Sequence, residues 1–163
     1  MEPAAVSLRS LRDRPFELLQ ELERRAKAAA LGAQSGAAQQ WIGVAFRMGG
    51  ETFLVARDET REIMGVPAPV TRVPGARAWI RGLANVRGQL LPIIDLKHYL
   101  GSGETQEGRN TRVIVVNHRE VPAGLLVDEV LGFRRFAEQD FHREPPPTLI
   151  RCENYLAGSF RRG

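Results

Sequence analysis

The stretch from Trp79 to Gly101 limits the possible folds of this chain more than any other segment. It contains two Arg-Gly pairs, Arg81-Gly82 and Arg87-Gly88. Each glycine marks a position where the backbone turns sharply or takes a positive φ, because glycine has no Cβ to clash with neighbouring backbone atoms. We therefore expect a sharp change of chain direction at each pair, and the apolar residues between and after the pairs then need burial.

Residues 90–96 follow the second pair, and their apolar side chains fall on nearly both faces of an extended chain. This pattern is typical of a strand buried on both sides. Pro92 has no N–H to donate, so one side of the strand must be a sheet edge or a bulge at that point. Asp95 is placed to cap a short helix, which Gly101 would end.

The region from Trp41 onward has the pattern of a β protein. Alternating apolar residues on both sides of Gly49-Gly50 predict a hairpin, and residues 111–116 and 121–130 predict a second one. Residues 57–65 fit either a helical turn or a short strand. Because short apolar runs with glycine and proline punctuation dominate, we expect an all-β barrel or sandwich.

The N-terminal part has a helical pattern instead. Residues 14–31 predict an amphipathic helix whose apolar stripe includes Phe16, Leu19 and Leu22, and a Gly-, Ala- and Gln-rich linker follows it up to Gln40. The stripe either packs on its own domain or docks onto a partner or a second copy of the protein.

The composition is that of a soluble globular protein with one ordinary domain. The chain has 163 residues, of which 43% are hydrophobic and 26% charged. We expect residues 1–40 to be the helix with its linker and residues 41–163 to be the β domain. The net charge of +4 and the pI near 10.0 invite a nucleic-acid-binding interpretation. The arginines are scattered, however, which is typical of a solvated surface.

Neither redox chemistry nor metal chemistry is indicated. Cys152 is the only cysteine, so no disulfide within the chain is possible, which fits a reducing compartment. His98, His118 and His142 each lack a second ligand nearby in sequence. The N-terminus lacks the apolar core of a secretory signal, and no segment approaches the ~18 apolar residues of a membrane span. We expect a cytoplasmic protein without metal, cofactor or membrane insertion.

No catalytic motif is present in the sequence. We find no GxGxxG that opens a helix, no P-loop, no GxSxG and no HExxH. Asp128-Glu129 ends a predicted strand, but no second acid is placed at a defined distance from it. These observations predict a protein that is not an enzyme and has no catalytic residues.

Three motifs follow one another in the stretch that constrains the fold. They are Arg81-Gly82, Asn85-Val86-Arg87-Gly88 and Pro92-Ile93-Ile94-Asp95-Leu96. In order and spacing they resemble the signature of the CheW family of chemotaxis coupling proteins, and the similarity extends from about Trp41 to the C-terminus. The N-terminal segment that begins Pro15-Phe16 resembles the branch of this family that serves type IV pili and twitching motility.

This resemblance implies a fold and a function. The fold would be two intertwined SH3-like five-stranded barrels. The function would be that of a non-catalytic adaptor, which bridges the cytoplasmic tip of a methyl-accepting chemoreceptor and the regulatory domain of a CheA-type histidine kinase. The residues that the resemblance places at or beside these contacts are Glu62, Arg81, Gly82, Asn85, Arg87 and Gly88.

Arg87 has two possible roles under this interpretation. It could present its planar guanidinium to a carboxylate of a partner, which lysine would not reproduce. Alternatively, it could bond backbone carbonyls and hold the loop between the barrels.

The competing function of a different class is a nucleic-acid-binding β-barrel. Such a protein needs basic residues interleaved with exposed aromatic residues on one sheet face. Trp41, Phe46 and Phe53 instead fall on apolar faces of their predicted strands, which counts against nucleic acid as a partner.

The chain departs from the family pattern at both ends. Shorter family members lack the N-terminal helix, and the family domain continues past the position of Gly163 with a further strand and a helix that complete the first barrel. We therefore expect an open strand edge with exposed apolar surface. We expect this edge to be covered by the N-terminal helix or by a second chain, so self-association through either is a prediction.

Overall fold

The computed structural model describes residues 39–118 and 121–161. The chain divides into two units, and the elements given below belong to the second unit, Gln40–Gly163. Within the described ranges, no helix is long and apolar enough to cross a membrane. The predicted amphipathic helix lies outside the described residues, and so do the members of its apolar stripe, Phe16, Leu19 and Leu22.

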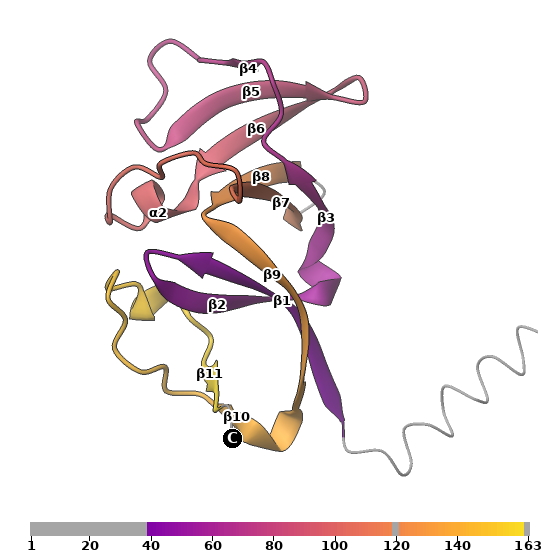
Figure 1. Ribbon diagram of the computed structural model, residues 1–163, viewed down its shortest axis with the longest axis vertical. Coiled ribbons are helices and arrows are strands. Elements are labelled where there is room, and N and C mark those ends of the chain that lie inside the picture. Colours follow the sequence, from indigo (N-terminus) through magenta and orange to yellow (C-terminus); the bar gives the residue numbers. More distant parts are fainter. Residues whose placement is uncertain (1–38, 119–120, 162–163) are drawn as a thin grey trace, which may run out of the picture. The chain divides into compact units, whose positions relative to one another are not determined.

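The described residues form short strands joined by turns (Figure 1). The strands are β1 (Gln40–Met48), β2 (Glu51–Ala56), β3 (Thr60–Gly65), β4 (Val70–Thr71), β5 (Ile80–Val86), β6 (Gln89–Asp95), β7 (Arg112–His118), β8 (Val121–Val127), β9 (Glu129–Ala137), β10 (Phe141–His142) and β11 (Ser159–Phe160). The helical elements are α2 (Leu96–Tyr99) and the 3-10 turns η2 (Arg57–Glu59), η3 (Glu138–Asp140) and η4 (Glu153–Tyr155). The predicted mainly β class is confirmed.

Most strands belong to two sheets. One sheet has the strand order β3-β7-β8-β6-β5-β4, and the other has the order β2-β1-β9. A small third sheet pairs β10 with β11. Neighbouring strands are antiparallel except for β6 and β8, which run parallel. In Figure 1, β9 leads from the six-stranded sheet down to the three-stranded sheet, where it pairs with β1.

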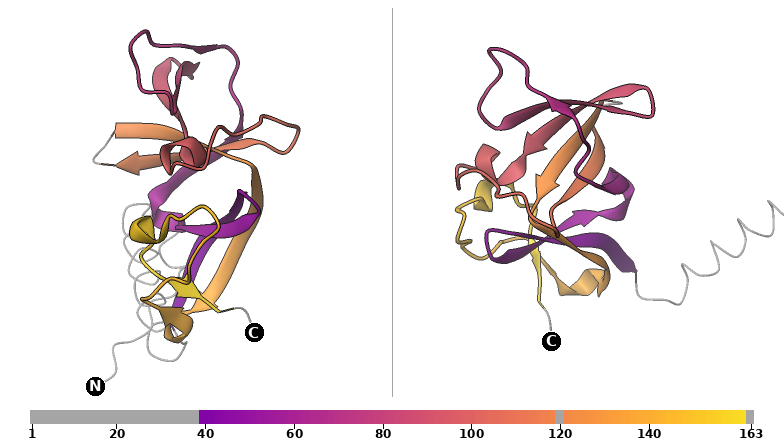
Figure 2. Two further views of the ribbon diagram at one scale, coloured as in Figure 1. Left: turned by 90° about the vertical axis from the view of Figure 1, so that its left-hand side faces the viewer. Right: turned by 45° about the horizontal axis from the view of Figure 1, so that its top comes forward.

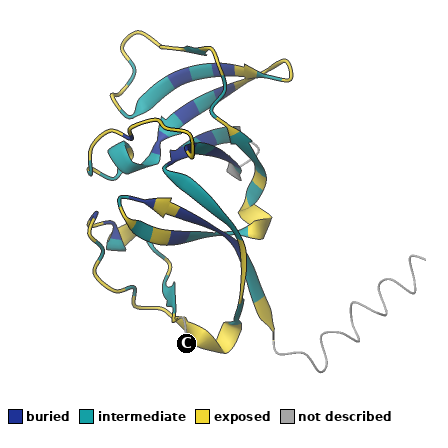
Figure 3. Ribbon diagram, viewed as in Figure 1, coloured by how far each residue is buried: buried dark blue, intermediate teal, exposed yellow. Residues whose placement is uncertain are grey.

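The β7–β8 hairpin separates two hydrophobic cores. Successive side chains of a strand point to opposite faces. On β7, Ile114 belongs to one core, whereas Val113 and Val115 belong to the other. On β8, Val127 and Leu126 divide between the two cores in the same way. Both faces of the hairpin are therefore apolar and buried, as the dark bands on these strands show in Figure 3.

Each core is completed by a different set of elements. The hairpin residues of the first core pack with residues of β1, β2 and the C-terminal segment: Val44, Phe46, Met48, Phe53, Ile150 and Cys152. Those of the second core pack with residues of β5 and β6: Ala84, Leu91 and Ile93. Two cores on either side of one shared hairpin are what two intertwined barrels require.

The prediction that β6 is buried on both sides is wrong in the first half of the strand. Leu91 and Ile93 are buried, but Leu90 is 66% exposed. The reason is that β8 pairs with β6 only from Ile93 onward, so the earlier residues have a neighbour on one side alone. Pro92 lies just before this point, on the part of the strand that faces no β8 partner. This position agrees with the edge that its missing N–H requires.

The prediction of one continuous strand over residues 121–130 is also wrong. β8 ends at Val127, Asp128 bends the chain, and β9 begins at Glu129. The Asp128 carboxylate accepts a hydrogen bond of 2.9 Å from the Gly49 N–H, which ties this bend to the β1–β2 turn. Asp128, which the sequence placed at the end of a strand, therefore bonds the β1–β2 turn. The chain continues from it into β9, which leads to the other sheet.

The remaining local predictions are confirmed or resolved. Gly49 and Gly50 have φ values of 60° and 87°, which is the geometry of a two-residue hairpin turn. Residues 57–65 adopt both of the alternatives that their sequence allowed, first η2 and then β3. The predicted cap of α2 is present, because the Asp95 side chain accepts a hydrogen bond from the His98 N–H.

The outer edge of β2 has no strand partner among the described residues. β2 is an end strand of its sheet. A groove of about 680 Å³ runs along it, lined by β2 itself and by residues between Phe141 and Phe160. Trp41 and Phe53 contribute apolar surface to this groove. The expected open edge is thus present in this part of the chain, and what covers it stays a prediction.

Leu126→Ala tests the shared hairpin. Leu126 is fully buried, so truncation leaves a cavity, and we expect the free energy of unfolding to fall by about 2–5 kcal/mol. Leu90→Ala is the matched control, because the same substitution at a side chain 66% exposed should change the free energy by less than about 0.5 kcal/mol. Urea denaturation measures both values, and equal losses would contradict the assigned burial.

Candidate protein-binding site

The β5–β6 turn carries Arg87 at its tip. Val86 pairs with Gln89, so Arg87 and Gly88 alone form the turn. Their φ values of 50° and 78° are both positive, as in a type I′ hairpin turn. Such turns favour Asn-Gly, because most residues with a Cβ are strained at positive φ. Arg87 thus occupies a position that local backbone preference does not favour.

Asn85 holds the turn in shape. Its side-chain oxygen accepts a hydrogen bond of 3.0 Å from the Gly88 N–H. Asparagine often closes turns in this way, since its short side chain reaches backbone groups two or three residues ahead. Asn85 and Gly88 therefore determine where the tip lies and how the Arg87 side chain leaves it.

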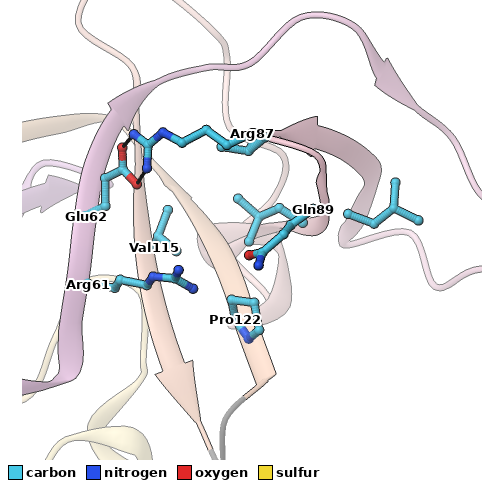
Figure 4. Close-up of a pocket in the computed structure, with 9 residues that line it drawn as sticks. Arg61, Glu62, Arg87, Gln89, Val115 and Pro122 are labelled. Carbon is cyan, nitrogen blue, oxygen red and sulfur yellow. Dashed lines mark hydrogen bonds and ion pairs between the residues drawn. The ribbon is translucent and has the colours of Figure 1, made fainter.

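Arg87 reaches across to Glu62 on β3 (Figure 4). Its Nη1 donates a hydrogen bond of 2.9 Å to Glu62 Oε2, and its Nη2 donates to Oε1 of the same carboxylate. Such a bidentate contact matches the planar guanidinium to a planar carboxylate. A bulge between Thr60 and Glu62, opposite β7, directs the glutamate. The pair therefore links the hairpin tip to β3, two segments 25 residues apart.

The pair is accessible to solvent. The Arg87 side chain is 74% exposed and that of Glu62 is 26% exposed. Hydrogen bonding to Glu62, and then charge attraction by it, raise the pKa of the Arg87 guanidinium above its usual value. Because the pair is accessible to solvent, it should weaken as the salt concentration rises. Exposed ion pairs contribute little to stability, so this pair should add little to the stability of the domain.

A shallow cleft of about 140 Å³ lies beside the pair. Arg61 and Gln89 contribute polar groups to its lining. Its apolar lining residues are Val86, Leu90, Leu91, Val115 and Pro122. Exposed apolar surface surrounded by polar and charged groups is the usual arrangement at a protein interface. Leu90, the residue whose burial was wrongly predicted, belongs to this surface.

Arg81 lies apart from this tip, near the beginning of β5. A bulge between Ile80 and Gly82 interrupts the strand here, and bulges commonly redirect a side chain. The Arg81 guanidinium pairs with Asp95 at 3.2 Å and with Glu104 at 3.0 Å. Its side chain is only 19% exposed. Arg81 therefore connects β5 to Asp95 at the end of β6 and to Glu104 in the loop after α2. It does not belong to the exposed tip.

Asp95 is the centre of this internal network. It is fully buried, and its carboxylate accepts hydrogen bonds from the Thr105 N–H at 2.8 Å and from the Thr105 hydroxyl at 2.7 Å. It also accepts from the Arg81 guanidinium and, at 3.2 Å, from the His98 N–H. One carboxylate thus joins β5, β6, α2 and the loop after α2. A buried charge needs partners of this kind to be tolerated.

Gly82 is required by a close approach of two strands. A Cβ at this position would clash with the carbonyl oxygen of Thr71 on β4, and φ is 145°. Glycine fits here because it is the only residue without a Cβ. The structure leaves Arg81 and Gly82 near the beginning of β5. The predicted contact residues that it brings together at the tip are Glu62, Asn85, Arg87 and Gly88.

Two features of the site could not be found in the sequence. The exposure of Leu90 depends on where β8 begins to pair with β6, and alternation of apolar residues does not report this. Thr105 is 2% exposed although it lies in a loop whose polar composition predicts a surface position. No local signal identifies it as the partner of Asp95.

Metal binding finds no support in the described part of the chain. Among residues 39–118 and 121–161, no group of three or more His, Cys, Asp or Glu side chains is placed to hold a metal ion. Cys152 is buried in the first core. Its Sγ lies 3.5 Å from the Thr148 hydroxyl.

Comparisons with known proteins agree with this fold. Residues 43–163 match the family model of the CheW-like domain. The chain is 41% identical over 150 residues to protein PilI of Pseudomonas aeruginosa, a match that covers 91% of this chain and 84% of that protein. It is 34% identical over 120 residues to the chemotaxis protein CheW of Rhizobium meliloti, with 74% of each chain covered.

A solved structure shows the same architecture. The scaffolding protein TtCheW from Thermoanaerobacter tengcongensis aligns with a TM-score of 0.68 at 26% identity, covering 76% of this chain and 84% of that chain. The likeness in fold is therefore to a scaffolding protein of the CheW type. The chain belongs to the CheW-like family and is a homologue of PilI.

Asp95→Ala tests the internal network. The substitution leaves Arg81 and Thr105 without their buried acceptor, so we expect the free energy of unfolding to fall by about 3 kcal/mol. Glu104→Ala is the control, because it removes the other, exposed partner of Arg81 and should cost less than about 1 kcal/mol. Thermal or urea denaturation measures both, and a larger loss for Glu104→Ala would show that the buried carboxylate is not the anchor.

Proposed function

We infer that this protein is a non-catalytic cytoplasmic adaptor. It couples the cytoplasmic tip of a methyl-accepting chemoreceptor to the regulatory domain of a CheA-type histidine kinase. Family membership supports the adaptor class, and the 41% identity to PilI supports a role in controlling twitching motility by type IV pili. The observation that carries the proposal is the exposed Glu62–Arg87 pair at a strained turn beside an apolar cleft.

An adaptor needs a partner surface whose position is determined by the rest of the domain. Coupling requires that a contact at one surface changes the geometry at another, which a loosely held loop cannot transmit. The Glu62–Arg87 pair meets this need, since Glu62 lies on a strand paired with the central hairpin. Arg87 is also joined to β5 and β6 through a turn of only two residues.

Among the described residues, Arg87 bonds the Glu62 carboxylate and not the backbone carbonyls that the structural alternative named, so a structural role would act through this ion pair. Its guanidinium is paired within the protein, yet its side chain is 74% exposed. A structural role would need only that the two side chains attract each other. A partner contact would need the positive charge at position 87 and the negative charge at position 62, because the groups of the partner are complementary to that arrangement.

A charge exchange separates these two roles. We expect Arg87→Ala to weaken binding to the kinase regulatory domain or to the receptor tip by about tenfold or more, as loss of an interface arginine commonly does. The double variant Glu62→Arg with Arg87→Glu restores an ion pair of reversed direction. Under the proposed partner role it should bind as poorly as Arg87→Ala in isothermal titration calorimetry.

Full recovery of binding in the exchanged variant would assign Arg87 a structural role. Arg87→Lys is a further control, because lysine keeps the charge but not the bidentate geometry. Absence of binding by the wild-type protein to both partners would overturn the adaptor function itself.

The three aromatic residues that were weighed for a nucleic-acid-binding barrel do not offer free rings. Phe46 and Phe53 are buried, and Trp41 packs against Phe160 with ring centroids 4.9 Å apart. Stacking on bases needs exposed rings. A salt-dependent mobility shift of single-stranded DNA at micromolar protein would favour this alternative.

Self-association is a further part of the proposal. Unpaired strand edges and apolar helix stripes both promote association, so we expect the full chain to exceed the monomer mass in size-exclusion chromatography with light scattering. If the helix is responsible, Leu19→Asp with Leu22→Asp should return the protein to a monomer. If the β2 edge is responsible, the mass should not change. A monomeric wild-type protein at high concentration would contradict the prediction.

A further inference from the structure

A second pocket lies at the other end of β5 from the Glu62–Arg87 pair. It has a volume of about 370 Å³ and is formed by the loop between β4 and β5, by α2 and by Glu104. Its lining holds three arginines, Arg72, Arg77 and Arg81, but Glu104 is its one acidic residue. The lining therefore carries a net positive charge.

Arg81 is paired with carboxylates of the protein, whereas Arg72 and Arg77 have no carboxylate partner among the described residues. Arg81 pairs with Asp95 and Glu104. Arg72 and Arg77 are exposed. Within the described ranges, no carboxylate oxygen lies within 4.0 Å of either of their guanidinium groups. Two such cations beside a concave surface attract an anion.

The pocket lining also contains buried nitrogens that lack hydrogen-bond partners. Arg81 Nε and His98 Nδ1 are buried, and neither has a partner among the described residues. A buried N–H without an acceptor is unfavourable, and such groups are rare in folded proteins. The described part of the chain thus leaves two polar atoms of the lining residues without partners.

An aromatic cluster adjoins lining residues of the pocket in the chain, because Trp79 follows Ala78 and Tyr99 follows His98. Trp79 packs edge-on against Tyr99 with ring centroids 5.0 Å apart, and Tyr99 packs against Tyr155 at 5.9 Å. Tyr99 and Tyr155 are 43% and 64% exposed. The β4–β5 loop, α2 and η4 lie along the left-hand side of Figure 1, which the left view of Figure 2 turns toward the viewer. Trp, Tyr and Arg are the residues that dominate binding energy at protein interfaces.

We propose that this pocket accepts an acidic side chain of a partner protein. Arg72 and Arg77 bind the carboxylate, and the aromatic cluster of Trp79, Tyr99 and Tyr155 packs against apolar residues that flank it in the partner. A protein is favoured over a free anion, because a free anion would not use the apolar area of the cluster. The inference rests on the proposed adaptor function for the identity of the partner, which is the kinase domain or the receptor tip.

A peptide titration tests the pocket without any assumption about the partner. The full chain labelled with ¹⁵N is titrated with the blocked peptide acetyl-Leu-Glu-Leu-amide and, separately, with its glutamine counterpart. We expect shifts of the Arg72 and Arg77 Nε–H signals and of the Trp79 indole. The glutamine peptide should bind about tenfold more weakly, because hydrogen bonds to an ionised acceptor are roughly twice as strong.

Two variants and one further ligand complete this test. Arg72→Glu with Arg77→Glu should abolish the shift of the Trp79 indole, whereas Arg134→Glu with Arg135→Glu makes the same charge change at exposed positions of β9 and should preserve it. Equal binding of the two peptides, or shifts that persist in the pocket variant, would overturn the proposal. An equal response to inorganic phosphate would also overturn it, since the site would then be one for a small anion.

Partner binding separates this inference from the adaptor function. The same two double variants are titrated against the kinase regulatory domain and the receptor tip. We expect the pocket variant to lose at least about tenfold in affinity for one of them, because a reversed charge now faces an acid. Wild-type affinity of the pocket variant for both partners would overturn the inference and leave the adaptor function standing. If the wild-type protein bound neither partner, the adaptor function would fail and the peptide titration would still decide the pocket.

Discussion

The β7–β8 hairpin is the constraint on which the rest of the domain depends. Its two strands are apolar on both faces, so a sheet covering one face alone would leave the other in water. The domain resolves this by placing one core on each side. β3 and β6 pair with the hairpin directly, and β9 carries the chain from it into the other sheet. The candidate site is attached to these strands, because Glu62 lies on β3 and Arg87 lies in the turn that leads into β6.

The two Arg-Gly pairs use the same chemistry for opposite purposes. Each arginine binds a carboxylate, but Arg81 binds the buried Asp95 and Arg87 binds the partly exposed Glu62. Burial decides the difference, because a charge removed from water must be fully partnered, whereas an exposed pair adds little stability and stays accessible. The internal pair holds the loop and helix around it in place. The external pair is thus presented by a framework that does not depend on it.

The placement of the two candidate surfaces suits an adaptor. The Glu62–Arg87 tip and the Arg72–Arg77 pocket lie toward opposite ends of β5, so one short strand connects them. Asp95 accepts a hydrogen bond from Arg81 on this strand, next to the pocket. Under the proposed function, β5 and the Asp95 network are the elements that would carry a displacement from one surface to the other.

The sequence by itself determined the β class, the first hairpin, the Asp95 cap and the motif that places Arg87 and Gly88 at a turn, because period-2 alternation, glycine and capping residues act over a few neighbouring positions. Only the tertiary structure decided that Leu90 is exposed, that Asp128 ends β8, and that Arg81 points to Asp95 while Arg87 points to Glu62. Each of these depends on a partner far away in the chain, such as the point where β8 meets β6 or the strand that carries Glu62. Local patterns indicate that a residue needs burial or a charged partner. Only the tertiary structure determines which residue provides it.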